Sequence, residues 1–230
     1  MGRSAVAVGI IIQARMGSTR LPGKILLPIA GRPLLDHILG RLANLLCITS
    51  VVVATGDSPQ DDAVAAFCAE REVDCFRGSE QDVLARYYEC ARRHSFNQIV
   101  RLTGDNPFID IDELDRLIRS HLAGDYDYSS SMEELPLGVG AEIFTYAALE
   151  RSFREGHAPH HREHVDEYIL ENPTLFRTGH LCVPEGKRHP EARLTVDTAE
   201  DLRRARFIAE NAPSTWVCTE EAIELCSRFA

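Results

Sequence analysis

The chain has 230 residues, of which 44% are hydrophobic and 26% charged, a composition typical of a globular protein with a substantial buried core. Its net charge of −10 argues against duplex nucleic acid or an anionic membrane as the main partner, because both need a wide basic face. The seven irregularly spaced cysteines and the absence of a spanning apolar stretch predict a cytoplasmic protein with reduced thiols.

Strand and helix patterns alternate about four times over residues 1–130. Continuous apolar runs predict strands buried on both faces, and apolar residues at helical spacing predict the helices between them. This alternation predicts an α/β fold with a mainly parallel, doubly wound sheet, in which ligands bind beyond the carboxyl ends of the strands. The expected strands are 6–12, 48–54, 73–76, 98–102 and 126–130, and the expected helices are 33–46, 61–72, one capped by Asp82 and one capped by Asp110 or Asp112.

From residue 131 the alternation stops, and no linker, repeat or low-complexity segment divides the chain. We therefore predict one domain over residues 1–230, with an inserted subregion at about 131–192 for the substrate or for dimerisation. The expected strands in this half are 142–145, 175–183 and 193–196, and the expected helices are 146–154, 161–171, one capped by Thr198 with Asp201, and 220–229 capped by Thr219.

The loop after the first strand combines cations, hydroxyls and glycines, as a polyphosphate site requires. It is not a Walker A loop, because five residues separate Gly17 from Gly23 and Ile25 follows Lys24. The dinucleotide pattern Gly-x-Gly-x-x-Gly is also missing. We interpret the loop as an anion site rather than as a solvated loop with arbitrary charges. Its cations are Arg15, Arg20 and Lys24, and its hydroxyls are Ser18 and Thr19.

Two carboxylates at expected strand ends are candidate ligands for a hard cation such as Mg²⁺. Asp105 could instead form an Asx-turn before Pro107, and Asp197 could be an extra capping residue. Asp110 and Asp112 match the Asp-x-Asp motif of many sugar-nucleotide glycosyltransferases, but their place at the start of an amphipathic helix favours a capping role.

A histidine-rich segment offers a further candidate site. A structural zinc site is one interpretation, but the segment contains no His-Glu-x-x-His, and one helix cannot direct all of these side chains at one ion. The pattern therefore favours a polar wall of a substrate pocket. The residues concerned are His157, His160, His161 and His164, with Glu163.

The motifs together resemble those of the sugar-activating cytidylyltransferases, which include the CMP-KDO and CMP-sialic acid synthetases. Within this family the chain is most similar to the branch called spore coat polysaccharide biosynthesis protein F. The specific match is residues 13–24, Gln-Ala-Arg-Met-Gly-Ser-Thr-Arg-Leu-Pro-Gly-Lys. Further matches in the same order are 82–88, 100–107, 138–144, 162–165 and 196–202.

The resemblance implies a GT-A-like nucleotidyltransferase fold, Mg²⁺ dependence and a homodimer built through the inserted subregion. Asp105 and Asp197 fall where the family places its metal ligands, and Lys24, Arg15 and Asp105 are the expected catalytic residues. One departure is Thr103, where the CMP-KDO synthetases have Gln before Gly-Asp. The expected nucleotide site is Gln13, Ala14, Arg15, Ser18, Thr19, Arg20, Lys24, Thr55, Thr103 and Gly104, and the expected sugar site is Arg101, Glu142, Glu163 and His164.

The function that follows is transfer of CMP from CTP to a sugar with release of pyrophosphate, for surface polysaccharide biosynthesis. Arg101 would suit a carboxylate-bearing sugar, so an acidic acceptor is expected. One alternative is a GT-A glycosyltransferase that uses a nucleotide-sugar donor through Asp110 and Asp112. Another is a non-catalytic nucleotide-binding partner, which would bind a triphosphate without turnover.

Overall fold

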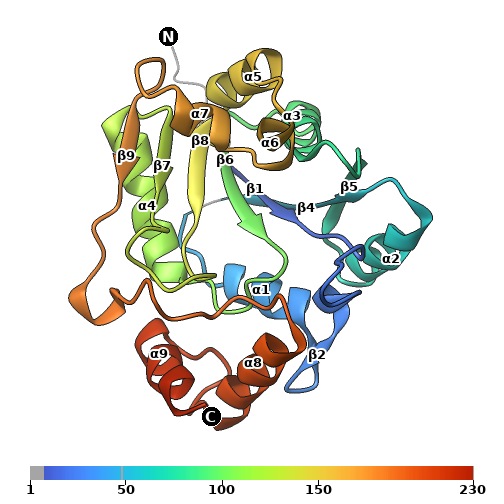
Figure 1. Ribbon diagram of the computed structural model, residues 1–230, viewed down its shortest axis with the longest axis vertical. Helices are drawn as coiled ribbons and strands as arrows, with labels where there is room; N and C mark the ends of the chain where they lie inside the picture. The colour runs from blue at the N-terminus through green and yellow to red at the C-terminus, as the bar shows by residue number, and fades with distance from the viewer. Residues whose placement is uncertain (1–7, 48, 230) are drawn as a thin grey trace.

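The computed structural model describes residues 8–47 and 49–229, and its centre is a seven-stranded sheet between two layers of helices (Figure 1). The strand order is β5-β4-β1-β6-β8-β7-β9. In the first half, β1 (Val8–Gln13) pairs in parallel with β4 (Ser50–Gly56) and β6 (Gln98–Thr103), and β4 pairs in parallel with β5 (Asp74–Gly78). The predicted parallel sheet is therefore confirmed for these four strands, and the carboxyl ends of β1, β4 and β6 lie at one edge.

The helices cover both faces of this sheet. One face packs against α1 (Leu34–Leu42), α2 (Asp62–Glu70), α4 (Ile111–Gly124), α8 (Ala199–Asn211) and α9 (Thr219–Arg228). The other packs against α3 (Val83–Arg93), α5 (Tyr146–Glu155) and α7 (Glu167–Glu171). The side chains of β1 alternate between these two apolar layers, because Ile10 and Ile12 face one and Ile11 faces the other. This explains the continuous apolar run in the sequence.

The second half extends the sheet with antiparallel pairing. β8 (Glu142–Thr145) lies between β6 and β7 (Tyr128–Ser130) and is antiparallel to both, while β9 (Thr178–His180) forms the edge, parallel to β7. The expected fifth strand therefore exists, but a strand from the inserted subregion separates it from β6. A two-stranded ribbon of β2 (Pro28–Ile29) and β3 (Arg32–Pro33) completes the strands among the described residues.

Four expectations for the second half are wrong in detail. The helix expected at 161–171 is two short helices, α6 (Pro159–Glu163) and α7, and the strand expected at 175–183 is reduced to the three residues of β9. Residues 193–196 form no strand, only an isolated bridge between Arg193 and Leu137. The last helix begins at Thr219 itself, with Cys218 as its N-cap residue. Residues 6, 7 and 48 of the expected strands lie outside the described residues.

Three predicted helix caps are confirmed. The Asp82 carboxylate accepts from the Ala85 N–H at 2.8 Å, and the Asp110 carboxylate accepts from the Glu113 N–H at 2.9 Å. Thr198 and Asp201 form a reciprocal capping box at the start of α8. The caps fix where α3, α4 and α8 begin, and residues at the starts of α3 and α8 line the cavity at the carboxyl edge of the sheet. No helix within the described ranges is long and apolar enough to cross a membrane.

Candidate active site

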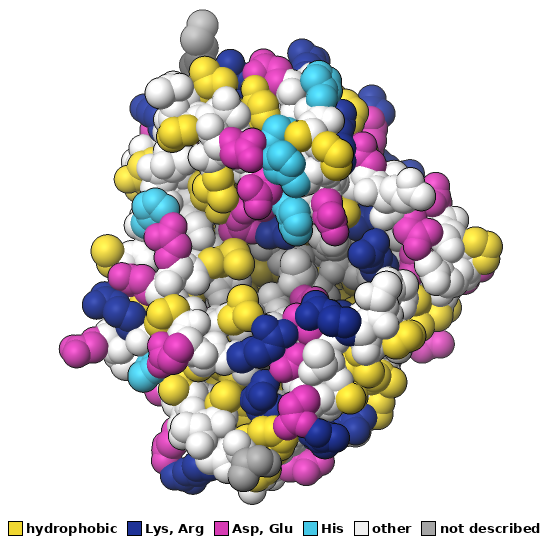
Figure 2. All heavy atoms as spheres, in the orientation of Figure 1, with side chains coloured by type: hydrophobic (Ala, Val, Ile, Leu, Met, Phe, Trp, Pro, Cys, Tyr) yellow, Lys and Arg dark blue, Asp and Glu magenta, His cyan; other side chains and the backbone are white. Residues whose placement is uncertain are grey.

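A cavity of about 680 Å³ opens at the carboxyl edge of β1 and β6. Figure 2 shows this face of the molecule hollowed near its centre, with histidine side chains above the hollow and lysine or arginine side chains below it. The wall combines the loop after β1, the ends of β6, the start of α3 and the region around α6. Its residues are Gln13, Ala14, Arg15, Gly17, Ser18, Thr19, Arg20, Lys24, Ile25, Gln81, Val83, Arg101, Thr103, Gly104, Asp105, Pro159, Glu163, His164 and Asp197.

The loop after β1 is held by backbone contacts at both ends. The Ala14 N–H donates to the Ala54 carbonyl at 3.1 Å, and the Gly104 N–H donates to the Gln13 carbonyl at 2.7 Å. Gly23 has a φ of 70°, and its N–H returns to the Met16 carbonyl at 3.0 Å. This left-handed turn, which favours glycine, closes the loop and directs Lys24 back toward the sheet.

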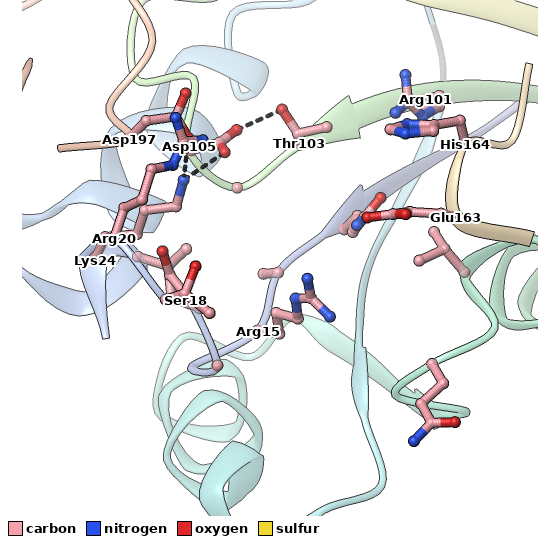
Figure 3. A pocket seen from close by; sticks show the side chains of 18 of the residues that line it. Arg15, Ser18, Arg20, Lys24, Arg101, Thr103, Asp105, Glu163, His164 and Asp197 are labelled. Carbon is pink, nitrogen blue, oxygen red and sulfur yellow. Dashed lines mark hydrogen bonds and ion pairs between the residues drawn. The ribbon is translucent and has the colours of Figure 1, made fainter. Parts of the chain in front are cut away.

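The Lys24 ammonium lies between two carboxylates that are distant in the sequence (Figure 3). Its Nζ is 2.7 Å from Asp105 Oδ2 and 2.8 Å from Asp197 Oδ1. Arg20 and Arg193 also pair with Asp197, at 3.0 and 2.7 Å. Burial opposes ionisation of Asp197, but the hydrogen bond and charge of Lys24, followed by Arg193 and Arg20, hold the pKa of this carboxyl below its ordinary value.

The backbone explains why these carboxylates meet. The Val196 N–H donates to the Asp105 carbonyl at 2.9 Å, so the segment before α8 runs beside the end of β6. Asp105 is oriented further by Thr103, whose hydroxyl donates to Asp105 Oδ1 at 2.6 Å. The structure thus gives Thr103 a role in holding Asp105, at the position where the resemblance marks a departure from the CMP-KDO synthetases.

The remaining groups of the loop are available to a ligand. Arg15 and Ser18 lie at the cavity wall in Figure 3, and within the described ranges Arg15 has no ion pair. Arg20 is 62% exposed even though it contacts Asp197. A polyphosphate in this cavity would therefore meet one unpaired guanidinium and the hydroxyls of Ser18 and Thr19, together with the exposed guanidinium of Arg20.

The same geometry tests whether a divalent cation fits. Asp105 Oδ2 and Asp197 Oδ1 are directed at a single point, and carboxylate oxygens are the ligands that Mg²⁺ prefers. The Lys24 ammonium occupies that point in this structure. The donor set therefore fits the ion, on the condition that the ammonium moves.

The opposite end of the cavity contains Arg101, Glu163 and His164 (Figure 3). Arg101 extends from β6 and donates through Nη1 to the buried carboxylate of Glu142, while Asp166 lies 4.0 Å from the same nitrogen. Burial works against the charge of Arg101, but these carboxylates, Glu142 first, raise the pKa of its guanidinium. The side chains of Glu163 and His164 have no hydrogen-bond or ion-pair partner among the described residues, so both can contact a substrate, while the backbone of His164 is held by the His160 carbonyl.

Two predicted site residues do not reach the cavity. Thr55 is fully buried in β4, and its hydroxyl has no partner among the described residues, so it is no nucleotide contact. Glu142 is only 2% exposed and lies beneath Arg101, where the Tyr128 hydroxyl donates to it at 2.6 Å. Its direct contact with a sugar is therefore wrong. Glu142 positions Arg101 instead. The sequence cannot tell a residue that contacts a ligand from one that supports its neighbour, because Arg101 and Glu142 belong to neighbouring strands, β6 and β8.

Sequence reasoning also missed residues of the site. Gln81 and Val83, at the start of α3, and Pro159 line the cavity. Asp61 is fully buried and accepts from the Met16 N–H at 2.7 Å, so it supports the loop from below. The capping signal at Asp82 marks a helix start at the carboxyl edge and could have indicated Gln81 and Val83; no sequence signal indicated Asp61.

The histidine cluster is only partly a cavity wall, because of its histidines only His164 lines the cavity. His160 and His161 instead lie 2.8 and 2.7 Å from the carboxylate of Glu171, a group with ligand spacing for a metal. The His161 Nδ1 accepts from the Ala158 N–H at 3.3 Å, so its Nε2 carries the proton that faces Glu171. A metal ion would need this nitrogen unprotonated. We therefore interpret the contacts of His160 and His161 with Glu171 as hydrogen bonds that join α6 to α7.

The Asp-x-Asp motif lies outside the cavity. Asp110 is 7% exposed, caps α4 and pairs with Lys187 at 2.8 Å. Asp112 is on the exposed side of the first turn of that helix. The capping interpretation of this motif is confirmed, and neither carboxylate can meet a ligand in the cavity.

A family model described as Cytidylyltransferase matches residues 9–224. The chain is 38% identical to the spore coat polysaccharide biosynthesis protein SpsF of Bacillus subtilis, over 88% of this chain and 86% of that one. It superimposes on a cytidylyltransferase structure from Leptospira borgpetersenii with a TM-score of 0.90 and 34% identity, covering 97% and 94% of the two chains. The fold is also that of a CMP:2-keto-3-deoxy-manno-octonic acid synthetase complexed with CTP, with a TM-score of 0.66, 20% identity and coverages of 87% and 97%.

Proposed function

Because the chain belongs to the cytidylyltransferase family, we propose that it transfers CMP from CTP to a sugar hydroxyl and releases pyrophosphate, in the synthesis of a surface polysaccharide. One observation carries the proposal. A loop with three cations and the carboxylates of Asp105 and Asp197 face the same cavity at the carboxyl edge of the sheet. This arrangement suits a triphosphate at one end and an acceptor at the other.

In this reaction the acceptor hydroxyl loses its proton to solvent and its oxygen forms a bond to the α-phosphorus of CTP, while the bond from that phosphorus to the oxygen that bridges the α- and β-phosphates breaks. The electron pair leaves with pyrophosphate, whose charge Arg15, Arg20 and Lys24 would neutralise. Such transfer depends mainly on positioning and charge neutralisation, because no covalent enzyme intermediate is needed. The loop can supply both.

We propose Mg²⁺ as the cofactor, held by Asp105 and Asp197. When bound, it would neutralise charge on the α-phosphate. Thr103 supports the assignment, because its hydrogen bond fixes Oδ1 of Asp105 and leaves Oδ2 facing the point that Asp197 Oδ1 also faces. Arg193 similarly holds the second oxygen of Asp197.

For the acceptor we propose an acidic sugar, since Arg101 keeps donors beyond Nη1 at the acceptor end of the cavity. The structural relative named for 2-keto-3-deoxy-manno-octonic acid is consistent with this class. The Glu142 ion pair reduces the net charge available to a carboxylate, so neutral sugars belong in the test.

The proposal extends to a homodimer formed through the inserted subregion. Leu137, Leu170 and Leu175 lie in this part of the chain and are 45%, 47% and 40% exposed. Contiguous exposed apolar patches mark interaction sites, and these three side chains are the candidates for such a patch in the inserted subregion. Sedimentation equilibrium of the full chain would give the mass of the assembly directly.

The decisive experiment measures pyrophosphate release from each of the four ribonucleoside triphosphates with Mg²⁺, against a panel of acidic and neutral sugars. We expect release that requires CTP and one class of sugar. Binding of a nucleoside diphosphate sugar without release from CTP would instead support a glycosyltransferase. Triphosphate binding without turnover on any sugar would support a nucleotide-binding partner.

Asp105→Asn should abolish pyrophosphate release while leaving the fold intact. The amide keeps the shape of the side chain and can still accept from Thr103, but it removes the charge that a cation requires. Circular dichroism and the thermal midpoint would establish the fold, and Asp112→Asn, on the exposed side of α4, is the matched control with full activity expected. Full activity in Asp105→Asn would contradict the metal assignment.

A further inference from the structure

The position of Lys24 differs from the one expected of a side chain that binds a triphosphate. A lysine that holds phosphates should face the phosphate site, but its ammonium is paired with both candidate metal ligands. The Lys24 side chain is only 10% exposed, and those of Asp105 and Asp197 are 24% and 18% exposed, so both ion pairs are partly buried at the cavity wall. The 2.7 and 2.8 Å distances place the ammonium where the two carboxylates converge.

One oxygen of each carboxylate already accepts a hydrogen bond from another side chain. Asp105 Oδ1 accepts from the Thr103 hydroxyl, and Asp197 Oδ2 accepts from Arg193. The remaining oxygens, Asp105 Oδ2 and Asp197 Oδ1, both face Lys24, and Arg20 adds a contact to the second of them. A divalent cation that used this pair of oxygens would take the place of the ammonium.

We propose that Lys24 is an internal counter-ion that closes the cation site between Asp105 and Asp197 until a triphosphate draws the ammonium away. CTP and the divalent cation would then bind cooperatively, and each would bind weakly alone. The inference rests on the proposed function for its choice of nucleotide, but the closed state is a property of the protein without nucleotide.

The charges of the cavity favour such an exchange. With Lys24 in place, two carboxylates face the ammonium, with Arg20 and Arg193 beside them, so this corner has no excess negative charge to attract a cation. A triphosphate bound beside Arg15 and Ser18 brings several negative charges to the same cavity and competes for the ammonium. Once the ammonium leaves, Asp105 Oδ2 and Asp197 Oδ1 lose their shared partner, and a divalent cation can take its place beside the added negative charge of the triphosphate.

The lysine content of the chain allows a direct measurement. Lys24 and Lys187 are its two lysines, and each pairs with two carboxylates. Labelling with ¹⁵N-lysine would therefore give two side-chain ammonium signals in an NMR spectrum, with Lys187, outside the cavity, as an internal control. We expect Mg²⁺ alone to leave the Lys24 signal in place, and Mg²⁺ with CTP to move it while the Lys187 signal stays. Movement with Mg²⁺ alone, or no movement with both, would overturn the proposal.

A second measurement uses Mn²⁺ as the probe without nucleotide, with free Mn²⁺ read from its electron paramagnetic resonance signal. Lys24→Met removes the ammonium and keeps a side chain of similar length, so we expect Mn²⁺ affinity to rise by roughly tenfold or more. Lys24→Arg keeps a cation and should show wild-type affinity. Adding Asp105→Asn to Lys24→Met should remove the gain.

Equal Mn²⁺ affinity in the wild type and in Lys24→Met would overturn the closed site, as would a gain that survives Asp105→Asn. Neither measurement requires turnover or a known sugar. A protein that passes both tests but releases no pyrophosphate would contradict the proposed function alone. A protein that releases pyrophosphate but fails them would contradict the internal counter-ion alone.

Discussion

Asp61 shows how one residue outside the cavity prepares the site. It is fully buried at the end of a 3₁₀ turn (Pro59–Asp61), and its Oδ1 accepts from the Met16 N–H at 2.7 Å. Met16 lies within the loop that carries the three cations, so this single bond joins the loop to the base of α2. No motif marks Asp61 in the sequence, because its partner is a backbone group 45 residues away.

Asp61→Ala should weaken CTP binding by roughly tenfold, because a displacement of about 1 Å in a positioned group can cost this much or more. The Met16 N–H would lose its acceptor and the loop its support. Equilibrium binding of CTP is the measurement. Asp62→Ala is the matched control, since this neighbouring carboxylate forms an exposed pair with Arg77, and it should bind CTP as the wild type does. Equal affinities in all three proteins would contradict the supporting role.

At the scale of elements, α4 contacts the sheet through a buried histidine as well as through its apolar face. His121 is 1% exposed, and its ring nitrogens lie 2.8 Å from the Ser129 hydroxyl of β7 and 3.0 Å from the Gln98 amide oxygen of β6. Burial lowers the pKa of His121 from an ordinary 6.5 to about 4, against a small opposing effect of Asp127. The helix therefore packs on the sheet with a neutral imidazole.

This shift predicts a loss of stability in acid. Between pH 6.5 and about 4 the unfolded chain binds a proton at His121 that the folded chain does not, so the free energy of unfolding falls as pH falls, by up to about 3 kcal/mol in total. His121→Gln should be less stable at pH 7 but lose less stability in this window, as urea unfolding at pH 7, 6 and 5 would show. His180→Gln, at an exposed site, should keep the wild-type slope. Parallel slopes for wild type and His121→Gln would contradict the assignment.

At the scale of the whole molecule, one buried ionic cluster joins the parallel half of the sheet to the antiparallel extension. Arg101 of β6 donates to Glu142 of β8, and Tyr128 of β7 donates to the same carboxylate. Burial raises the pKa of Glu142 despite the opposing charge of Arg101, because a buried carboxylate is costly to ionise. The cluster thus joins the two halves of the sheet and also directs Arg101 to the end of the cavity that contains Glu163 and His164.

Glu142→Ala should lower the free energy of unfolding by about 3–5 kcal/mol, because it removes the direct partner of the buried Arg101 guanidinium and leaves only Asp166, 4.0 Å from its Nη1. The double variant Arg101→Met with Glu142→Leu should recover part of this loss, since it removes both charges. Chemical denaturation is the measurement, and Arg154→Ala, which breaks an exposed pair with Glu150, should leave the midpoint unchanged. A stability of Glu142→Ala close to the wild type would show that the cluster is not structural.

The sequence by itself determined the parallel half of the fold and most of the cavity wall formed by the loop after β1. Apolar runs, helix caps and the order of loops are local signals, and a parallel sheet brings the loops that follow its strands to one edge. It predicted Lys24, Arg15, Asp105 and Asp197 at one site, and the structure places all four on one cavity wall.

Only the tertiary structure decided which of these groups are free and which are paired. Thr55 is buried and does not reach the cavity, and Glu142 is buried behind Arg101. The Asp110 motif lies outside the cavity, where Asp110 pairs with Lys187. Strand order and the break between α6 and α7 also depend on contacts between residues distant in the sequence. The position of Lys24 is the clearest case, because ion pairs across 81 and 173 residues set it, and no local pattern encodes them.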